Sequence, residues 1–332
     1  MHPFASKLLQ WYSVNARSLP WRDCGNAYAI WLSEIILQQT RISQGTAYWQ
    51  RFMQRFPTVE SLAAASEDEV LRLWQGLGYY SRARHLHEAA RQIVAMQHMP
   101  HTYNEWLTIS GVGPYTAAAI ASAAYGEPVP AIDGNANRVL ARCFGVTQAV
   151  NTAAGSHQIG EIARQVLPPH YAADFNQALM DFGSLQCVPQ SPQCSQCVMS
   201  SLCMALQQNM VEQLPAKKST VKVKPMTMVY VYLRYQGKTA IRRRPAGGIW
   251  QGLYEPLLLG QIGDLPASDG TLTPIAKGVN HVLTHRVITA DFYLLDLNEP
   301  MALPQNYFWV AETELDRYAK PRLIERLLQM LP

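Results

Sequence analysis

Two hydrophobic patterns divide the chain, and the change between them falls near residue 220. Before it, apolar residues recur at intervals of three and four, the spacing of an amphipathic helix, and clear alternating strands are missing. After it, short runs rich in valine, isoleucine and aromatic residues suggest strands separated by turns. The pattern predicts a helical first part and a second part that mixes strands with helix.

Capping residues mark several helices in the first part. The stretch SEDEVLRLWQGLG opens with Ser66 and acids in its first turn, and it closes on Gly76 and Gly78. Four further stretches have helical patterns: YAIWLSEIILQQT, GPYTAAAIASAAYG, NANRVLARCFG and DFNQALMDFGSLQC. These stretches indicate a succession of helices with short connections.

Turn and strand signals organise the second part. Gln236-Gly237 lies between β-rich residues and predicts a hairpin. ITADFYLLDL and NYFWVAE favour further strands, and KPRLIERLLQML favours a closing helix. We therefore expect a helical domain over residues 1–210, a linker over 211–225 and a smaller α+β domain over 226–332.

Composition and charge limit the number of domains and the cellular compartment that we expect. The 332 residues are 48% hydrophobic, enough for one large domain or two ordinary ones. No apolar run approaches the roughly 20 residues of a membrane span, and the first residues lack the pattern of an export signal. We expect a cytoplasmic protein, whose six cysteines then favour metal or buried thiols over disulfides. The net charge is +4, and four lysines without an acid lie in residues 216–225, which we interpret as a solvated tether.

Four cysteines within seventeen residues form the most specific motif. The run CVPQSPQCSQCVMSSLC has the spacing C-x6-C-x2-C-x5-C and can surround one metal centre, either an iron–sulfur cluster or a structural zinc. The full spacing, at the end of a helical domain, resembles the endonuclease III superfamily of DNA glycosylases. That resemblance implies a [4Fe–4S] cluster held by Cys187, Cys194, Cys197 and Cys203. No Lys or Arg lies between the first and last of them, so direct phosphate contact by this loop is not expected.

A glycine-rich connection precedes the cysteines. ISGVGPYTAAAI places Gly111 and Gly113 between two helical stretches, where a tight turn and free helix N–H groups can hold a phosphate without reading the base. By itself the segment could be a plain helix connection. Together with the cysteine loop it resembles the helix–hairpin–helix of the same superfamily.

Two carboxylates are candidates for chemistry. Asp133, in AIDGNANRVLARC, can cap the following helix, and the helix dipole keeps it ionised. Glu34 is an acid among apolar neighbours in WLSEIILQQT; it lies either on a polar face or in a pocket, where burial would raise its pKa. One protonated acid and one fixed anion divide the work of breaking a glycosidic bond.

Several motifs together resemble one branch of the superfamily. LPWR, WLSEIILQQT, GLGYYSRAR, GVGPYTA, DGNANRVLAR and FNQALMDFG resemble the MutY-type adenine DNA glycosylases, closely over residues 8–205. The resemblance implies that Glu34 protonates adenine at N7, and that Asp133 stabilises the oxocarbenium ion or captures it covalently. Tyr115 stands where bifunctional relatives carry a lysine, which implies a monofunctional enzyme. Asn135 is then expected to support the water and phosphate region.

The same resemblance assigns substrate contacts. Chemistry on a base requires its extrusion from the duplex. Gln39 and Tyr79 match the wedge positions beside the orphaned base, although a polar helix end and a loop aromatic are ordinary structural alternatives. Residues that match the adenine pocket are Trp21, Arg22 and Gln177.

The second domain resembles the Nudix fold through AIRRRPAGGIWQGLYEPLLL, but the acidic metal motif of Nudix hydrolases does not follow. In MutY-type proteins this domain reads 8-oxoguanine. Thr284 and His285 match that loop, with His281 a less certain neighbour and Leu283 in place of an aromatic residue. We expect a monomeric repair enzyme of the bacterial nucleoid that removes adenine opposite 8-oxoguanine or guanine. The alternatives are a mismatch thymine glycosylase and a non-catalytic DNA-lesion-binding protein.

Overall fold

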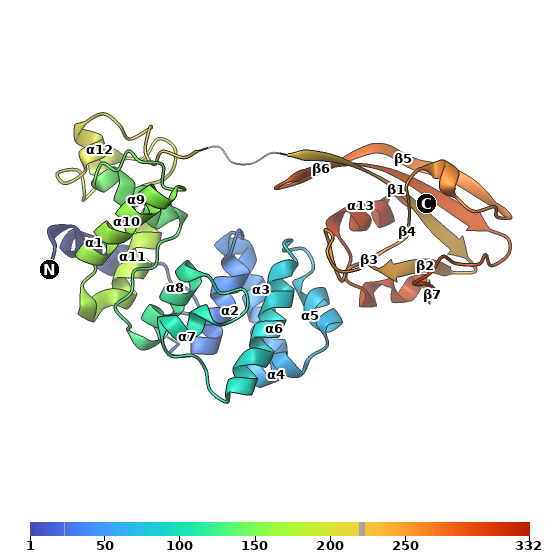
Figure 1. Ribbon diagram of the computed structural model, residues 1–332, viewed down its shortest axis with the longest axis horizontal. Coiled ribbons are helices and arrows are strands. Elements are labelled where there is room, and N and C mark those ends of the chain that lie inside the picture. Colours follow the sequence, from blue (N-terminus) through green and yellow to red (C-terminus); the bar gives the residue numbers. More distant parts are fainter. Residues whose placement is uncertain (23, 219–222) are drawn as a thin grey trace. The chain divides into compact units, whose positions relative to one another are not determined.

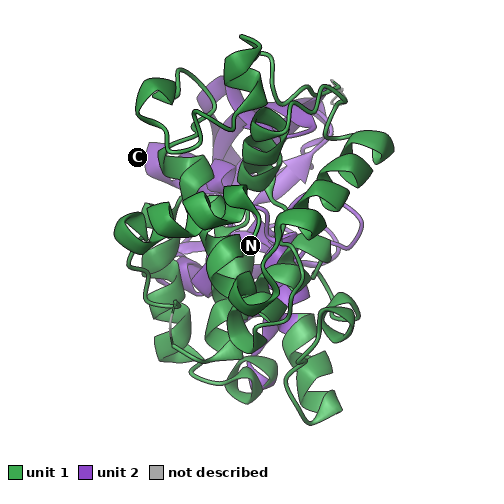
Figure 2. Cartoon of the chain, turned by 90° about the vertical axis from the view of Figure 1, so that its left-hand side faces the viewer, with its two compact units in different colours: residues 1–63, 88–219 green, residues 64–87, 220–332 purple. Residues whose placement is uncertain are grey.

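The computed structural model describes residues 1–22, 24–218 and 223–332, and the chain divides into two compact units. Unit 1 comprises residues 1–63 and 88–219, and unit 2 comprises residues 64–87 and 220–332 (Figure 2). Helix α6 (Ser81–Met96) runs from one unit into the other. The division differs from the expected boundaries because a short helical segment groups with the C-terminal part.

Unit 1 is built from helices, as the three-and-four spacing predicts, and its described residues contain no strand (Figure 1). Its helices are α1 (Pro3–Asn15), α2 (Ala27–Leu37), α3 (Ile42–Arg55), α4 (Val59–Ala64), α7 (Tyr103–Leu107), α8 (Pro114–Tyr125), α9 (Gly134–Cys143), α10 (Ala153–Val166), α11 (Ala172–Leu185) and α12 (Met204–Gln207). Short 3-10 helices cover Pro169–Tyr171 and Cys194–Gln196.

The core of unit 1 explains where the candidate side chains meet. Helices α1, α9, α10 and α11 share one buried cluster, with Phe4, Phe175 and Phe182 almost completely buried. Helix α2 packs against α3 and α8, and α8 packs against α7 and α11. The start of α9, the middle of α2 and the first turn of α8 therefore come together around α11.

Unit 2 contains a seven-stranded sheet with the order β3-β2-β1-β6-β5, to which β4 and β7 pair at β1 and β2. The strands are β1 (Lys224–Tyr235), β2 (Lys238–Arg243), β3 (Tyr254–Glu255), β4 (Leu257–Leu259), β5 (Gly270–Leu283), β6 (Arg286–Leu297) and β7 (Tyr307–Ala311). Strands β1 and β6 are parallel, and the other pairs are antiparallel. The expected hairpin is confirmed: Gln236 and Gly237 have φ of 46° and 69°, and their neighbours Tyr235 and Lys238 pair.

The sheet of unit 2 is covered on both faces, which explains the continuous apolar run in β1. Met228 and Tyr230 pack in one cluster with α13 (Arg322–Met330), whereas Val229 and Val231 pack in a second cluster. Strand β5 was not predicted, because most of its side chains are exposed or only partly buried and the strand lacks a core-facing apolar run.

Helix α5 (Glu67–Trp74) belongs to unit 2 through polar contacts with the sheet. Arg243 pairs with Glu67 at 2.7 Å, and the Tyr254 hydroxyl donates to Asp68 at 2.9 Å. The turn after α5 adds a hydrogen bond of 2.5 Å from Gln75 Nε2 to Glu325. These contacts join residues that lie far apart in the sequence, so sequence patterns did not indicate them.

Candidate active site

Glu34 lies on α2 and lines a cavity in unit 1. Nearly all of α2 is buried, and its N-cap Asn26 accepts a hydrogen bond from Ala29 N, which fixes where the helix begins. The cavity is also lined by the three residues that match an adenine pocket, namely Trp21, Arg22 and Gln177. The structure therefore brings Glu34 together with these three side chains.

Tyr115, in the first turn of α8, donates a hydrogen bond to Glu34 Oε2 at 2.9 Å. Burial raises the pKa of Glu34 to about 7. The negative charge of Asp133 also raises this pKa, whereas the Tyr115 hydrogen bond and the Arg22 cation lower it. Near neutral pH a substantial share of Glu34 is protonated and able to give its proton away.

Asp133 is the N-cap of α9. Its Oδ1 accepts from Ala136 N at 2.7 Å, and its Oδ2 accepts from Asn135 Nδ2 at 2.8 Å. The charge of Asp133 raises the pKa values of both Glu34 and Tyr115, although Asp133 is not among the described residues that line the cavity beside Glu34. The cap role is compatible with a catalytic role, because helix N–H groups stabilise the negative charge of a capping carboxylate.

A buried ion pair supports Arg22, and the sequence reasoning missed its acidic member. Arg22 Nη1 and Nη2 donate to the two oxygens of Asp181 on α11, each at 2.8 Å. Arg17 Nε donates to Asp181 Oδ1 at 2.8 Å. The sequence signal for Asp181 was its place as an acid inside the apolar stretch FNQALMDFG. Its partners follow only from the packing of α11 against the loop before α2.

Arg138 joins the candidate active site to the cysteine loop, a role that no sequence pattern indicated. Its Nη2 donates to Asn135 Oδ1 at 2.8 Å, and its Nε donates to the carbonyl of Cys187, also at 2.8 Å. Arg138 is buried, so these bonds hold the start of α9 and the loop in one arrangement.

The glycine-rich connection between α7 and α8 has the predicted geometry. Gly111 has a φ of 75°, in the region that glycine adopts without strain. Gly113 is the exposed N-cap of α8, where no side chain caps the helix N–H groups. Uncapped N–H groups at a helix start are donors of the kind that bind anions in other proteins.

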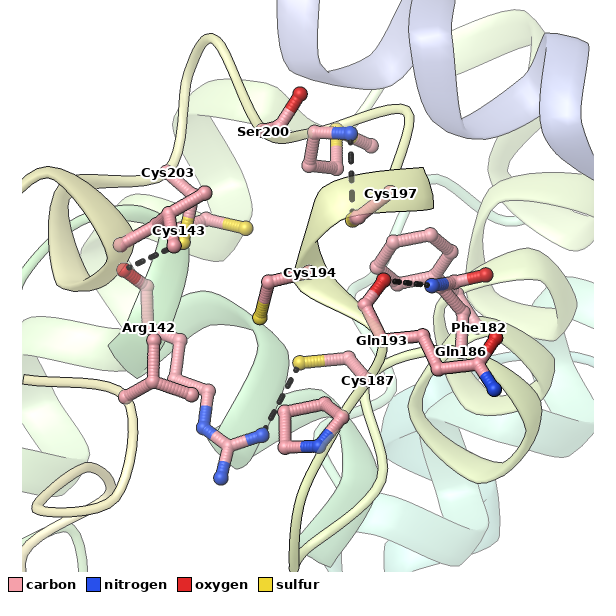
Figure 3. Close-up of a pocket in the computed structure, with 14 residues that line it drawn as sticks. Arg142, Cys143, Phe182, Gln186, Cys187, Gln193, Cys194, Cys197, Ser200 and Cys203 are labelled. Atoms are coloured by element: carbon pink, nitrogen blue, oxygen red, sulfur yellow. Dashed lines mark hydrogen bonds between the residues drawn. The ribbon is translucent and has the colours of Figure 1, made fainter.

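The four loop cysteines surround one pocket with Arg142 and Cys143 (Figure 3). Arg142 is buried, and its Nη1 lies 3.5 Å from Cys187 Sγ. A hydrogen bond from Cys143 lowers the pKa of Cys203 to about 6, which favours the thiolate that binds metal. Burial instead raises the pKa of Cys197 to about 11. A bound cation would stabilise the Cys197 thiolate and so offset the cost of burying its charge.

Four thiols that line one pocket are compatible with two kinds of metal centre, a single zinc ion and a cubane iron–sulfur cluster. Among the described residues, no group of three or more His, Cys, Asp or Glu side chains is arranged to hold a single metal ion. Zinc needs four sulfurs about 2.3 Å from one point, whereas a cubane cluster accepts thiolates that stand farther apart.

In unit 2, the turn between β5 and β6 carries Thr284 and His285, both exposed. The Thr284 hydroxyl lies 2.9 Å from the Tyr79 hydroxyl, and either atom can be the donor. Tyr79 has a φ of 47° and is 52% exposed. Together with Leu283, these residues line a cavity of about 730 Å³, in which His281 packs edge-on against Trp250 with ring centroids 5.6 Å apart.

Gln39, the other residue that matches a wedge position, is exposed in the turn after α2 of unit 1, with a φ of 56°. It therefore belongs to a different compact unit from Tyr79. No helix of the described residues combines the length and apolarity needed to cross a bilayer.

Three family models match the chain. Residues 32–168 match the HhH-GPD superfamily of base excision DNA repair proteins. Residues 187–203 match the iron–sulfur binding domain of endonuclease III, and residues 228–330 match a NUDIX domain. The fold class predicted from the sequence is confirmed. The cysteine loop is an iron–sulfur binding domain, and its cofactor is a [4Fe–4S] cluster.

Solved structures show the same helical fold. A thermostable thymine-DNA glycosylase has a TM-score of 0.58 at 29% identity, covering 62% of this chain and 95% of that one. A non-covalent endonuclease III–DNA complex has a TM-score of 0.54 at 20% identity, with the same coverage, and supports the fold alone.

Curated relatives identify the branch. The human adenine DNA glycosylase is 44% identical over 227 residues, which cover 65% of this chain and 42% of the relative. The matched part is thus under half the length of that relative. The adenine DNA glycosylase of Buchnera aphidicola subsp. Schizaphis graminum is 31% identical over 76% of this chain and 74% of its own length. The chain therefore belongs to the adenine DNA glycosylase family.

Proposed function

We propose that the protein removes adenine paired with 8-oxoguanine or guanine in duplex DNA. The observation that carries the proposal is Glu34, whose raised pKa of about 7 coincides with its place in a cavity beside Trp21 and Gln177. A proton donor of this kind suits a base that leaves poorly as an anion. Family membership supports the choice of adenine.

In the proposed mechanism, Glu34 gives its proton to N7 of the extruded adenine, so that the base departs neutral. Asp133, fixed by Ala136 N and Asn135, stabilises the positive charge that develops on the sugar or captures it covalently before water attacks. Gln177 offers both a donor and an acceptor to the adenine edge.

Tyr115 separates this mechanism from that of strand-cleaving relatives. Its hydroxyl is committed to Glu34 and lacks the amine that a Schiff base needs. We therefore expect base release without efficient strand cleavage. Asn137, four residues after Asp133, donates to the Asp133 carbonyl and adds no amine either.

Recognition of the opposite base falls to unit 2 in this proposal. Thr284 and His285 present hydrogen-bonding groups at an exposed turn, and Tyr79 offers an aromatic wedge beside Thr284. The cluster, held by Cys187, Cys194, Cys197 and Cys203, stabilises the loop and its docking onto DNA. Gly111 and Gly113 open the helix start to a phosphate. We expect a monomer acting on DNA in the bacterial nucleoid.

A single-turnover assay tests the function. Duplexes carry A or T opposite 8-oxoguanine or guanine, and the released base is measured. We expect release of adenine and not of thymine. Release of thymine would support a mismatch thymine glycosylase, in line with the 29% identical structure, and no release with intact duplex binding would support a non-catalytic lesion binder.

A further inference from the structure

The buried carboxylate of Asp181 controls where the guanidinium of Arg22 points. The Asp181 side chain is completely buried, and the Arg22 side chain is only 9% exposed. Both Nη groups of Arg22 donate to Asp181 at 2.8 Å, the two-pronged geometry in which a guanidinium matches a carboxylate. The Arg17 carbonyl also accepts from Arg22 Nη1, at 3.0 Å.

Asp181 is well suited to hold this cation. Burial acts to raise the pKa of Asp181, but hydrogen bonds from Arg22 and Arg17 outweigh it and leave that pKa below its usual value. Asp181 is therefore an anion at neutral pH. Arg17, whose side chain is partly exposed, also donates to Asp181, so two guanidinium groups bind this carboxylate.

The placement of Arg22 matters because it shares a cavity with Glu34. A buried guanidinium that loses its partner is costly, so pairing with another carboxylate of the same cavity becomes favourable. Glu34 lines the same cavity, and the Arg22 charge already lowers its pKa against the effect of burial. A Glu34 paired with Arg22 would be an anion, with no proton to give.

We propose that Asp181 is a positioning residue that holds the Arg22 guanidinium away from Glu34 and so preserves the Glu34 carboxyl as a proton donor. This role rests on the proposed function, in which Glu34 protonates the leaving base. It also explains why α11 carries an acid inside an apolar stretch: Asp181 competes with Glu34 for the same cation.

Other charged and titratable groups around this pocket come from each neighbouring element. They are Tyr12 of α1, Arg17 and Arg22 before α2, Tyr115 of α8, Asp133 at the start of α9, and Asp174 and Asp181 of α11. The Tyr115 hydroxyl donates to Glu34, and the Asp133 carboxylate accepts from Asn135 Nδ2 and Ala136 N. Asp23 lies outside the described residues.

The test is the pH profile of single-turnover adenine excision, measured across the range that brackets the Glu34 pKa of about 7. Excision needs protonated Glu34, so the rate falls as pH rises through this pKa. Asp181→Asn should move the midpoint of that fall to lower pH by one unit or more. One unit corresponds to a rate about tenfold lower on the alkaline side, with the acidic side much less affected.

Two further variants test the direction of the midpoint shift, which distinguishes the proposed role from general structural damage. Arg22→Gln removes the cation and should move the midpoint to higher pH, although it changes the rate itself. Arg17→Gln removes the other partner of Asp181 but leaves the two hydrogen bonds between Arg22 and Asp181. The midpoint of this variant should therefore match that of the wild type. Equal loss of rate at every pH in Asp181→Asn, or a shift of the same sign in Asp181→Asn and Arg22→Gln, overturns the proposal.

Further controls keep the inference independent of folding and of the proposed function. Circular dichroism and the cluster absorbance report whether each variant folds. If Asp181→Asn does not fold, Arg22→Gln decides alone, and an unchanged or lowered midpoint overturns the role of Asp181. A wild type that releases no base contradicts the proposed function only. In that case a ¹³C NMR titration of the Glu34 carboxyl in the same variants tests Asp181 without excision.

Discussion

The cavity of unit 1 and the turn of unit 2 are built in opposite ways. In unit 1, Asp181 and Arg138 are buried, and they hold Arg22 and Asn135 through several hydrogen bonds. At the turn, Thr284 and His285 are exposed, and the hydrogen bond between Thr284 and Tyr79 lies at the surface. Chemistry needs charges fixed away from water, where they act strongly. Recognition of a partner needs groups that the partner can reach.

This contrast predicts that changes in unit 1 affect the rate of excision, whereas changes at the turn affect the choice of opposite base. The largest effect is expected for Glu34→Gln, which keeps the shape of the side chain and removes the proton donor. We expect excision to fall on the order of 10³-fold, within the usual range for loss of a general acid, with duplex binding unchanged. Single-turnover rates and a gel-shift titration measure the two quantities.

Glu161→Gln is the matched control for that substitution. Glu161 is an exposed acid of α10 that pairs with Arg164, so its loss should leave the rate unchanged. Weak duplex binding by Glu34→Gln would mean that the residue holds the fold, and it would remove the contrast between the two regions.

The second largest effect is the pH dependence of the wild-type enzyme. Because burial raises the pKa of Glu34 to about 7, the protonated form is lost as pH rises through that value. The excision rate should fall about tenfold for each pH unit above it, as a single ionisation requires. A rate that stays flat across this range would show that another group donates the proton.

A smaller effect is expected at the turn of unit 2. Thr284→Ala removes the hydroxyl beside Tyr79, and one neutral hydrogen bond corresponds to roughly a fivefold change. We expect the ratio of excision rates opposite 8-oxoguanine and guanine to fall by this factor, with little change opposite guanine. Thr271→Ala, an exposed threonine of β5, is the control and should leave the ratio unchanged. Equal loss opposite both bases would assign the turn to general DNA binding.

The smallest effect is expected for loss of the hydrogen bond between Tyr115 and Glu34. Tyr115→Phe removes the hydrogen bond that lowers the pKa of Glu34, so this pKa should rise and the alkaline fall of the rate should shift to higher pH. The shift should be smaller than the effect of burial, which is the larger cause of the raised pKa. Tyr125→Phe, at the other end of α8, should leave the profile unchanged. A shift to lower pH in Tyr115→Phe would reverse the assigned role of this hydrogen bond.

Short sequence patterns predicted the caps and turns that depend on neighbouring residues. Ser66 accepts the predicted cap bond of α5, Gln236-Gly237 forms the predicted turn, and Gly113 begins α8 as its neighbours indicated. Strand β5 and the grouping of α5 with unit 2 were not predicted. The grouping of α5 depends on polar contacts between residues more than 170 positions apart, which no short window contains. Strand β5 pairs with its neighbour β6, but its exposed and partly buried side chains give no core-facing apolar run.

The sequence by itself therefore determined the helical and mixed parts, the cysteine spacing and the identity of the two candidate carboxylates, because each depends on residue types at short separation. Only the tertiary structure decided that Glu34 lies against Tyr115 in a cavity and that its pKa rises. The pairing of Arg22 with Asp181 across 159 positions was likewise settled by the packing of α11. Burial and charge pairing depend on what surrounds a side chain in space, and that surrounding comes from distant parts of the chain.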